Sequence, residues 1–138
     1  MRSVYDSILS KSALDPIAAS AATNGIVIDT FGYNSATFAV QNGAVTGTPD
    51  SYTLNAKLQE GALANGSDMA DVSGVTITQI TADSKIAVIR VDGLGTTRKR
   101  YLRVVVTPAL TGGTSPKALI SAVANLGRAY KKPVGNAT

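Results

Sequence analysis

Lys99-Arg100-Tyr101-Leu102-Arg103-Val104-Val105-Val106-Thr107-Pro108 is the stretch of sequence that decides the fold. Leu102, Val104 and Val106 recur at every second position, so they lie on one side of an extended chain. This period predicts a half-buried strand at the centre of a sheet. Pro108 has no backbone N–H, and we expect it to end the pairing of this strand.

Five further stretches have the alternating or β-branched composition of strands. The cleanest alternation runs from Tyr52 to Glu60, where the apolar side chains fall on one face and the polar ones on the other. Turns are predicted at Asn24-Gly25 and Asn42-Gly43, and between the last two stretches. The five predicted strands are 26–29, 36–41, 52–60, 75–80 and 85–91.

The apolar segment from Ala118 to Leu126 allows two interpretations. Ser115-Pro116 before it and Gly127 after it resemble the cap, first position and stop of a helix. As a strand, the same segment places alanine, isoleucine and leucine side chains on one face. We predict a strand, because a closing strand beside 99–108 completes the sheets.

Short strands at intervals of about ten residues are typical of an all-β protein. The predicted fold is an antiparallel β-sandwich or jelly-roll-like barrel, occupying residues 24–138. Residues 1–23 are weakly periodic and are broken by Asp15-Pro16, so we expect an extended N-terminal arm. Within this arm, Val4 and Ile8 have the spacing of one helical turn, and 12–18 could form a short strand.

The composition excludes several classes of function. The 138 residues contain no cysteine and no histidine, which removes disulfides, thiolate chemistry and the commonest general base and metal ligand. We therefore expect no enzyme activity, no cofactor and no small-molecule substrate. The short apolar run 17–22 is too small for a membrane span, and no secretory signal is recognised.

Charge is distributed unevenly along the chain. The net charge is +4, yet residues 1–92 carry nine acidic and five basic side chains, whereas 93–138 carry eight basic ones and no acidic one. Such segregation fits either docking on an acidic surface or ordinary solvated loop and edge charges.

Two loops contain residues that could bind small ions. Asn65-Gly66-Ser67-Asp68, with Asp71, gathers oxygens that Ca²⁺ could use, but the alternating carboxylates and closing Glu of a calcium loop are missing, so a plain turn is preferred. Asp92-Gly93-Leu94-Gly95 lacks the further residues of a phosphate cradle and is interpreted as a hairpin loop.

Arg98, Lys99, Arg100 and Arg103 form the one dense basic cluster, with Tyr101 between them. An arginine and a tyrosine on one strand face could clamp nucleic acid, but few aromatic residues are available for stacking. The preferred interpretation is that Arg103 makes a cross-strand or intersubunit ion pair.

Several motifs, in their order along the chain, resemble a known class of proteins over about residues 23–134. The similarity is to the small β-sandwich proteins encoded near the head genes of tailed bacteriophages and prophages, several of which are capsid decoration (cement) proteins. The motifs are Phe31-Gly32-Tyr33-Asn34-Ser35-Ala36, Gly43-Ala44-Val45-Thr46, Lys57-Leu58-Gln59-Glu60, Asp71-Val72, Lys99-Arg100-Tyr101-Leu102-Arg103-Val104, and Ala122-Val123-Ala124-Asn125-Leu126-Gly127 closing on Lys132-Pro133-Val134.

The resemblance implies a jelly-roll-like sandwich, in a homotrimer, that stabilises the outside of an icosahedral capsid by bridging major capsid subunits. The protein would be made in the bacterial host cytoplasm and end on the virion surface. The alternatives are a head-completion or tail structural protein, and a host-surface or glycan-binding module. The residues expected at capsid or intersubunit interfaces are Val4, Ile8, Arg98, Lys99, Arg100, Arg103, Lys131 and Lys132.

Overall fold

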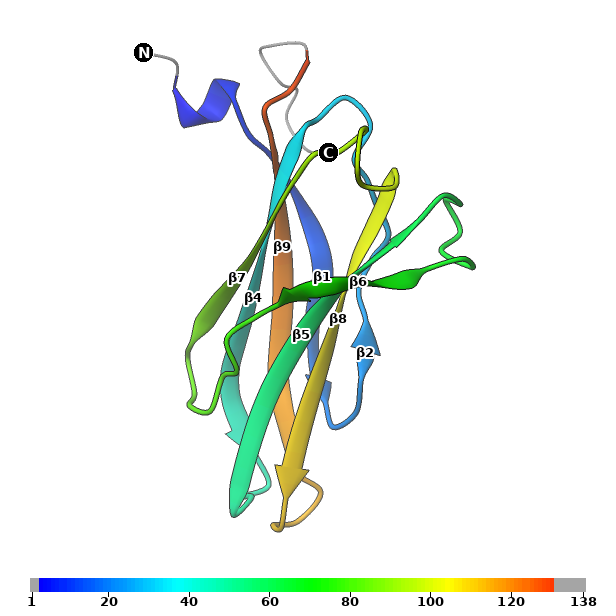
Figure 1. Cartoon of the computed structure of the whole chain (residues 1–138). Helices are drawn as coiled ribbons and strands as arrows, with labels where there is room; N and C mark the ends of the chain where they lie inside the picture. The colour runs from blue at the N-terminus through cyan, green and yellow to red at the C-terminus, as the bar shows by residue number, and fades with distance from the viewer. Residues whose placement is uncertain (1–2, 131–138) are drawn as a thin grey trace.

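The chain forms two antiparallel sheets that face each other, with β5 and β8 in front of β4, β9 and β1 in Figure 1. This computed structural model describes residues 3–130. One turn of 3₁₀ helix, η1 (Val4–Asp6), precedes the first strand. Sheet A has the order β1 (Leu9–Ala19), β9 (Lys117–Gly127), β4 (Ser35–Thr46), β7 (Ile86–Asp92). In sheet B, β8 (Tyr101–Thr111) pairs on one side with β2 (Thr23–Asn24) and β3 (Ile28–Asp29), and on the other with β5 (Ser51–Gly61), which pairs with β6 (Ala70–Thr76).

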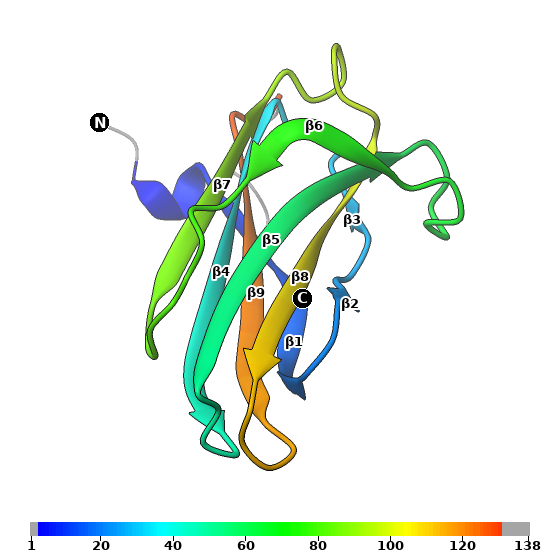
Figure 2. The ribbon, with the colours of Figure 1, turned by 60° about the horizontal axis from the view of Figure 1, so that its bottom comes forward.

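The strand pairs are nested in the way that defines a jelly roll. If β2 and β3 are counted as one interrupted strand, the first strand pairs with the eighth, the second with the seventh, the third with the sixth and the fourth with the fifth. The chain is thus one long antiparallel ribbon folded over itself. The predicted all-β, jelly-roll-like sandwich is confirmed, and the two sheets remain separate layers rather than a closed barrel, as Figure 2 shows.

The core lies between the sheets and is made by the alternation that the sequence predicted. Leu102, Val104 and Val106 of β8 are fully buried, and Phe38 of β4 is the largest side chain they meet across the layer. Much of sheet A's inner surface is alanine, which lets the layers approach closely. The remaining fully buried large side chains include Leu54, Leu58, Ile89, Leu94 and Leu126.

The central strand is confirmed, but the expectation that Pro108 ends it is wrong. β8 continues to Thr111, with Pro108 paired to Leu54 of β5. Leu54 exchanges its backbone hydrogen bonds with Ile80, so it directs no hydrogen bond toward Pro108. The nitrogen of Pro108 faces the opposite side of β8, where β2 reaches only as far as Val106. A proline costs no ladder hydrogen bond at such a position.

The segment from Ala118 to Leu126 is a strand, as predicted, but it lies in the interior of sheet A and not beside residues 99–108, which form β8 of sheet B. Ala118, Ile120, Ala122, Ala124 and Leu126 are buried, in the alternation expected for a strand. Ser115 adopts a left-handed conformation with φ of 45°, so it caps no helix. Pairing with β1 on one side and β4 on the other outweighs the local helix signals.

The N-terminal segment differs from the predicted arm. The strand suggested for 12–18 is longer, and as β1 it pairs with β9 from Leu9 to Ala19. Residues 9–19 are therefore an edge strand of the sandwich. The part of the chain before them does form a helical turn, which in Figure 1 lies beyond the end of the sheets.

The turns predicted at Asn24-Gly25 and Asn42-Gly43 are not formed. β4 runs through Asn42-Gly43 to Thr46, with an irregularity in its pairing to β9 between Asn42 and Val45. Gly25 instead crosses between the layers: its N–H donates to the Val104 carbonyl in sheet B, while the next N–H, of Ile26, donates to the Ala13 carbonyl in sheet A. In the described residues, no helix has the length and apolar character needed to cross a membrane.

Candidate functional site

The outer face of sheet A carries a row of apolar side chains across three strands. Ala39 of β4 is paired with Val88 of β7 on one side and with Val123 of β9 on the other. Residues paired in this way present their side chains on the same face of a sheet. Ile86 and Leu119 extend the row along their strands. We call these five residues, Ala39, Ile86, Val88, Leu119 and Val123, the apolar face.

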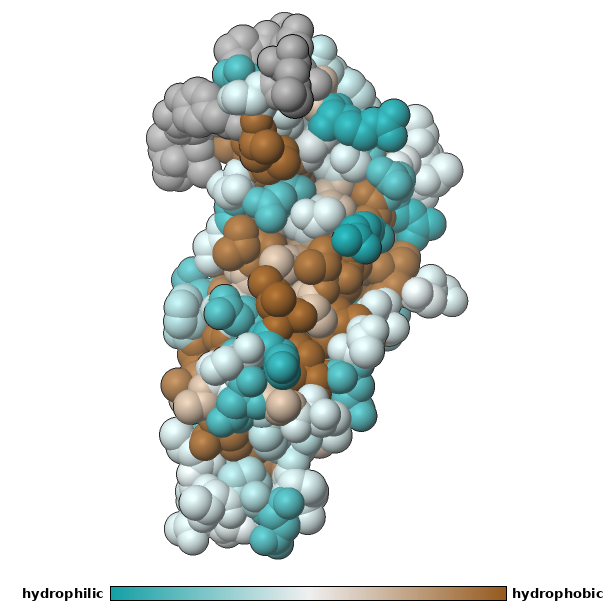
Figure 3. Space-filling view, turned by 90° about the vertical axis from the view of Figure 1, so that its left-hand side faces the viewer, coloured by the Kyte–Doolittle hydropathy of each residue, from teal (hydrophilic) through white to brown (hydrophobic). Residues whose placement is uncertain are grey.

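Four members of the apolar face are large and open to solvent. Ile86 is 62% exposed, and Val88, Leu119 and Val123 are each between 41% and 43% exposed. Figure 3, which views the molecule from the β7 side, shows hydrophobic side chains gathered in a band along its length. Contiguous exposed apolar surface on a small domain is typical of a protein interaction site.

No charged side chain lies among the outward positions of β4 and β9 within the apolar face, although Asp15 of β1 is hydrogen-bonded to Ser12, the pairing partner of Val123. The outward positions that complete it on β4 and β9 are Gln41, Gly43 and Ser121, and none is charged. Arg90 lies one row beyond Val88, and Lys117 begins β9 at the opposite end. Beside Leu119, an open hollow of about 330 Å³ is lined in part by Ile17 and Gly43. The centre of the face is therefore uncharged, with a hollow beside Leu119.

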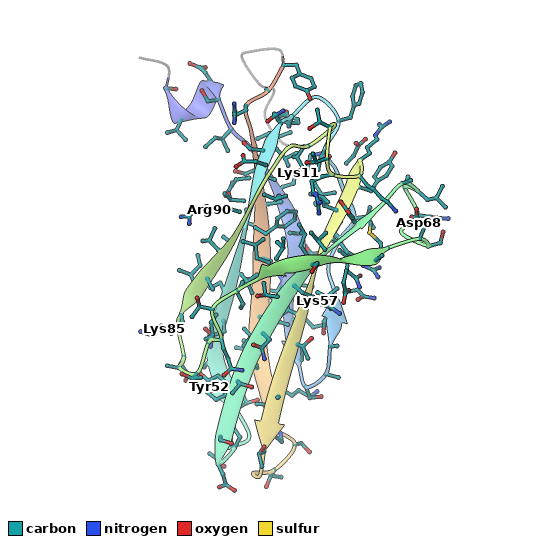
Figure 4. All side chains as sticks on the ribbon, in the orientation of Figure 1. Lys11, Tyr52, Lys57, Asp68, Lys85 and Arg90 are labelled. Carbon is teal, nitrogen blue, oxygen red and sulfur yellow. The ribbon has the colours of Figure 1, made fainter. Side chains whose placement is uncertain are left out.

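The outer face of sheet B is polar, and its groups bind one another. Lys57 Nζ lies 2.7 Å from Asp71 Oδ2, and Gln59 Nε2 donates to the other Asp71 oxygen at 2.7 Å. Arg103 Nε donates to Gln59 Oε1 at 2.8 Å. Figure 4 shows Lys57 beside β6, where this network begins. The hydrogen bond from Lys57, followed by that from Gln59, lowers the pKa of Asp71.

The basic cluster predicted from the sequence gathers at one end of sheet B, but two of its guanidinium groups are already paired. Arg100 donates to both carboxylate oxygens of Asp29 at 2.8 Å, and its hydrogen bond is the main cause of the lowered pKa of that carboxyl group. The same guanidinium lies 4.8 Å from the centre of the Phe31 ring. Arg98 lies 3.6 Å from Glu60.

The other predicted interface residues fall in different places. Arg103 does have a cross-strand partner, although it is the Gln59 carboxamide rather than a carboxylate. The Lys99 backbone N–H donates to Glu60. Val4 and Ile8 are 72% and 39% exposed, in and just after η1 at the start of the chain. Lys131 and Lys132 lie outside the described residues.

The polar loop considered for Ca²⁺ uses its carboxylate to hold its own backbone. Asp68 accepts hydrogen bonds from the N–H groups of Ala62 and Leu63 at 2.8 and 3.1 Å, and these lower its pKa. Asn65 accepts one from Ser67 N–H at 3.0 Å, as in a plain turn. Among residues 3–130, no cluster of three acidic, cysteine or histidine side chains could hold a metal ion.

Comparisons with known proteins leave the family open. No family model matches the chain, and no curated protein is similar to it in sequence. Two similar solved structures are "Crystal structure of PirA", with a TM-score of 0.37 and 12% identity over 93% of this chain and 97% of that one, and "Structure of a family two carbohydrate esterase from Cellvibrio japonicus", with a TM-score of 0.34 and 10% identity over 96% of this chain and 36% of that one.

Proposed function

We propose that this protein is a structural subunit that docks through the apolar face of sheet A onto a protein assembly, and that the assembly is the capsid of a tailed bacteriophage. The docking is inferred from the contrast between the outer faces of sheet A and sheet B. Sheet A presents exposed Ile86, Val88, Leu119 and Val123 with no charge among them, whereas the polar groups of sheet B bind one another.

Desolvation favours sheet A as the docking surface. Covering the apolar face removes hydrocarbon from water, at a gain of about 25 cal/mol for each Å². Covering sheet B would instead bury the Lys57–Asp71 pair, whose side chains are 42% and 55% exposed, and desolvating such a pair is costly. The partner surface is accordingly a flat apolar patch on a capsid subunit.

The capsid part of the proposal is supported by the sequence motifs that resemble decoration proteins and by the jelly-roll topology, which occurs among capsid components and among lectins. In this role the protein performs no reaction. A homotrimer that bridges several capsid subunits gains retention from multivalency, because once one contact forms the others act at high effective concentration. Binding to the assembled lattice rather than to free subunits stabilises the shell by mass action.

The direct test is the copy number of this chain in purified virions of the phage that encodes it. Quantitative mass spectrometry against the major capsid protein should give hundreds of copies for a decoration protein. A few to a few dozen copies would assign it to head completion or the tail, and absence from virions would reject the proposal. Binding of the isolated protein to host cells or glycans would favour the surface-binding alternative.

A matched pair of variants tests the docking face. Val123→Glu places a charge at the centre of the apolar face, where we expect it to reduce capsid occupancy at least tenfold. Ala109→Glu adds the same charge at an exposed position of sheet B and should leave occupancy unchanged. Equal occupancy of both variants and the unaltered protein would exclude sheet A as the docking face.

A further inference from the structure

The free edge of β7 lacks the features that protect the other sheet edges. β1 contains Pro16 and two register shifts, β6 contains a register shift and Gly74, and β2 and β3 are two residues long. β7 pairs with β4 through seven consecutive residues without interruption and contains no glycine or proline. A regular edge with exposed apolar side chains is a template for another strand.

The pairing with β4 determines which backbone groups of β7 are free. The Asn42 N–H donates to the Lys85 carbonyl, so in this register Ala87, Ile89 and Val91 direct their N–H and C=O groups at β4. Ile86, Val88 and Arg90 alternate with them and direct their backbone groups away from the sheet. Only an extended backbone presents donors and acceptors at the matching spacing.

Arg90 adds a charge requirement to this edge. Its side chain points away from the sandwich beside β7 in Figure 4, and it has no ion-pair partner within residues 3–130. A strand that pairs here is favoured if it carries an acidic residue opposite Arg90 and an apolar residue opposite Val88.

The start of this chain has that pattern. Val4, Asp6 and Ile8 occupy alternate positions, with Val4 and Ile8 exposed, and within residues 3–130 the turn η1 is held by three backbone hydrogen bonds. In an antiparallel pairing that sets Asp6 against Arg90, Ile8 falls against Val88. The six residues 3–8 would span about 20 Å as a strand, close to the length of β7.

We propose that residues 3–8 of one copy add as a strand to the β7 edge of a second copy. The segment cannot make this pairing in its own chain, because Ile8 is followed directly by Leu9 of β1, and β1 lies three strand spacings, about 14 Å, from β7 across β9 and β4. Donor and acceptor are different surfaces, so the contact is head to tail and three copies can close a ring. This inference concerns contacts between copies and needs no capsid, so it can fail while the proposed function holds.

Sedimentation velocity of the full chain in solution over a concentration series, with variants of both strands, tests the proposal. The unaltered protein should self-associate. Val88→Pro removes an N–H that faces the edge and leaves the ladder to β4 intact, so it should abolish association without unfolding the domain. Val88→Thr keeps both the shape and the N–H, and should associate like the unaltered protein.

Charge reversal identifies the partner segment. Asp6→Arg and Arg90→Asp should each weaken association at least tenfold, and the double variant should recover most of it, because it restores an opposite-charge pair. A monomeric full chain, an oligomer unaffected by Val88→Pro, or a double variant no better than its single variants would each overturn the proposal.

Discussion

Asn42 and Lys85 are joined by two hydrogen bonds. The backbone N–H of Asn42 donates to the Lys85 carbonyl at 3.0 Å, and the Lys85 N–H donates to the Asn42 carboxamide oxygen at 2.9 Å. The Asn42 side chain is fully buried, and its nitrogen also donates to the Ala82 carbonyl at 3.0 Å. A single buried amide thus holds the turn that leads into β7 and fixes where that edge strand begins.

Asn42→Ala should reduce the free energy of unfolding by about 1–2 kcal/mol, because the Lys85 N–H and the Ala82 carbonyl lose partly buried hydrogen bonds to this amide. Chemical denaturation measures this loss. Gln41→Ala, at the exposed neighbouring position, should change stability by less than about 0.5 kcal/mol. Equal effects of the two substitutions would contradict the role given to the buried amide.

The hydroxyl group of Tyr52 should make the folded state lose stability at alkaline pH. Burial, together with the hydrogen bond that its hydroxyl donates to Asp83 at 2.7 Å, raises its pKa to about 12. The folded state therefore retains this proton while the unfolded chain, with a pKa near 10, releases it. Stability contributed by Tyr52 is complete below pH 10 and declines as the pH rises toward 12. Thermal unfolding of Tyr52→Phe should show a shallower decline over this interval than the unaltered protein.

The Asp29–Arg100 pair predicts a dependence on acid and salt. Because the pKa of Asp29 lies below its ordinary value of 3.8, its contribution to stability is present above that value and is lost as the pH falls through the lower one. Asp29→Asn should make the acid-induced decline in melting temperature less steep. Since both side chains are 40–49% exposed, added salt should reduce the difference between the two proteins. A salt-independent difference would indicate a cause other than this ion pair.

Two truncations distinguish the role of residues 3–8 from the role of β1. At protein concentrations too low for self-association, removal of residues 1–8 should leave the melting temperature almost unchanged, because β1 begins at Leu9. Removal of 1–20 deletes β1 and exposes one side of β9, so a large loss of folded protein is expected. Circular dichroism on both truncations measures the difference, and a cooperatively folded 21–138 fragment would show that β1 is dispensable.

The sequence alone predicts a strand wherever apolar and polar residues alternate within the strand itself, as they do from Tyr52 to Glu60. From Leu102 to Val106, apolar residues recur at every second position in the same way. The wrong predictions, that Pro108 ends its strand and that Asn42-Gly43 forms a turn, have a common cause. In both places, residues distant in sequence decide whether the strand continues. Pro108 is tolerated because β2 ends before it, and Asn42 stays in a strand because Lys85 and Ala82 satisfy its amide.

The candidate docking face was only partly visible in the sequence. The unbroken apolar run Ile86–Ile89 signals a strand that is apolar on both faces, but alternation alone cannot tell which face is covered. Only the order of strands in sheet A brings Val88 and Val123 into one row with Ala39. The basic cluster was the stronger signal in the sequence, yet the fold pairs Arg98 and Arg100 with carboxylates from distant segments.

Gly25 lies where the fold leaves no room for a side chain. A Cβ added to it would lie 2.7 Å from the Val104 carbonyl oxygen and closer still to that of Ala13, and both are backbone atoms of paired strands. Neither can move without breaking the hydrogen bonds by which residues 25 and 26 link the two sheets. Gly25→Ala should therefore cost about 2–3 kcal/mol. Gly43→Ala, whose added methyl would make an ordinary 3.4 Å contact with Leu119, is the control. Equal denaturation midpoints for the two variants would contradict this prediction, because they would show that the two sheets can move apart at residue 25 to admit a side chain.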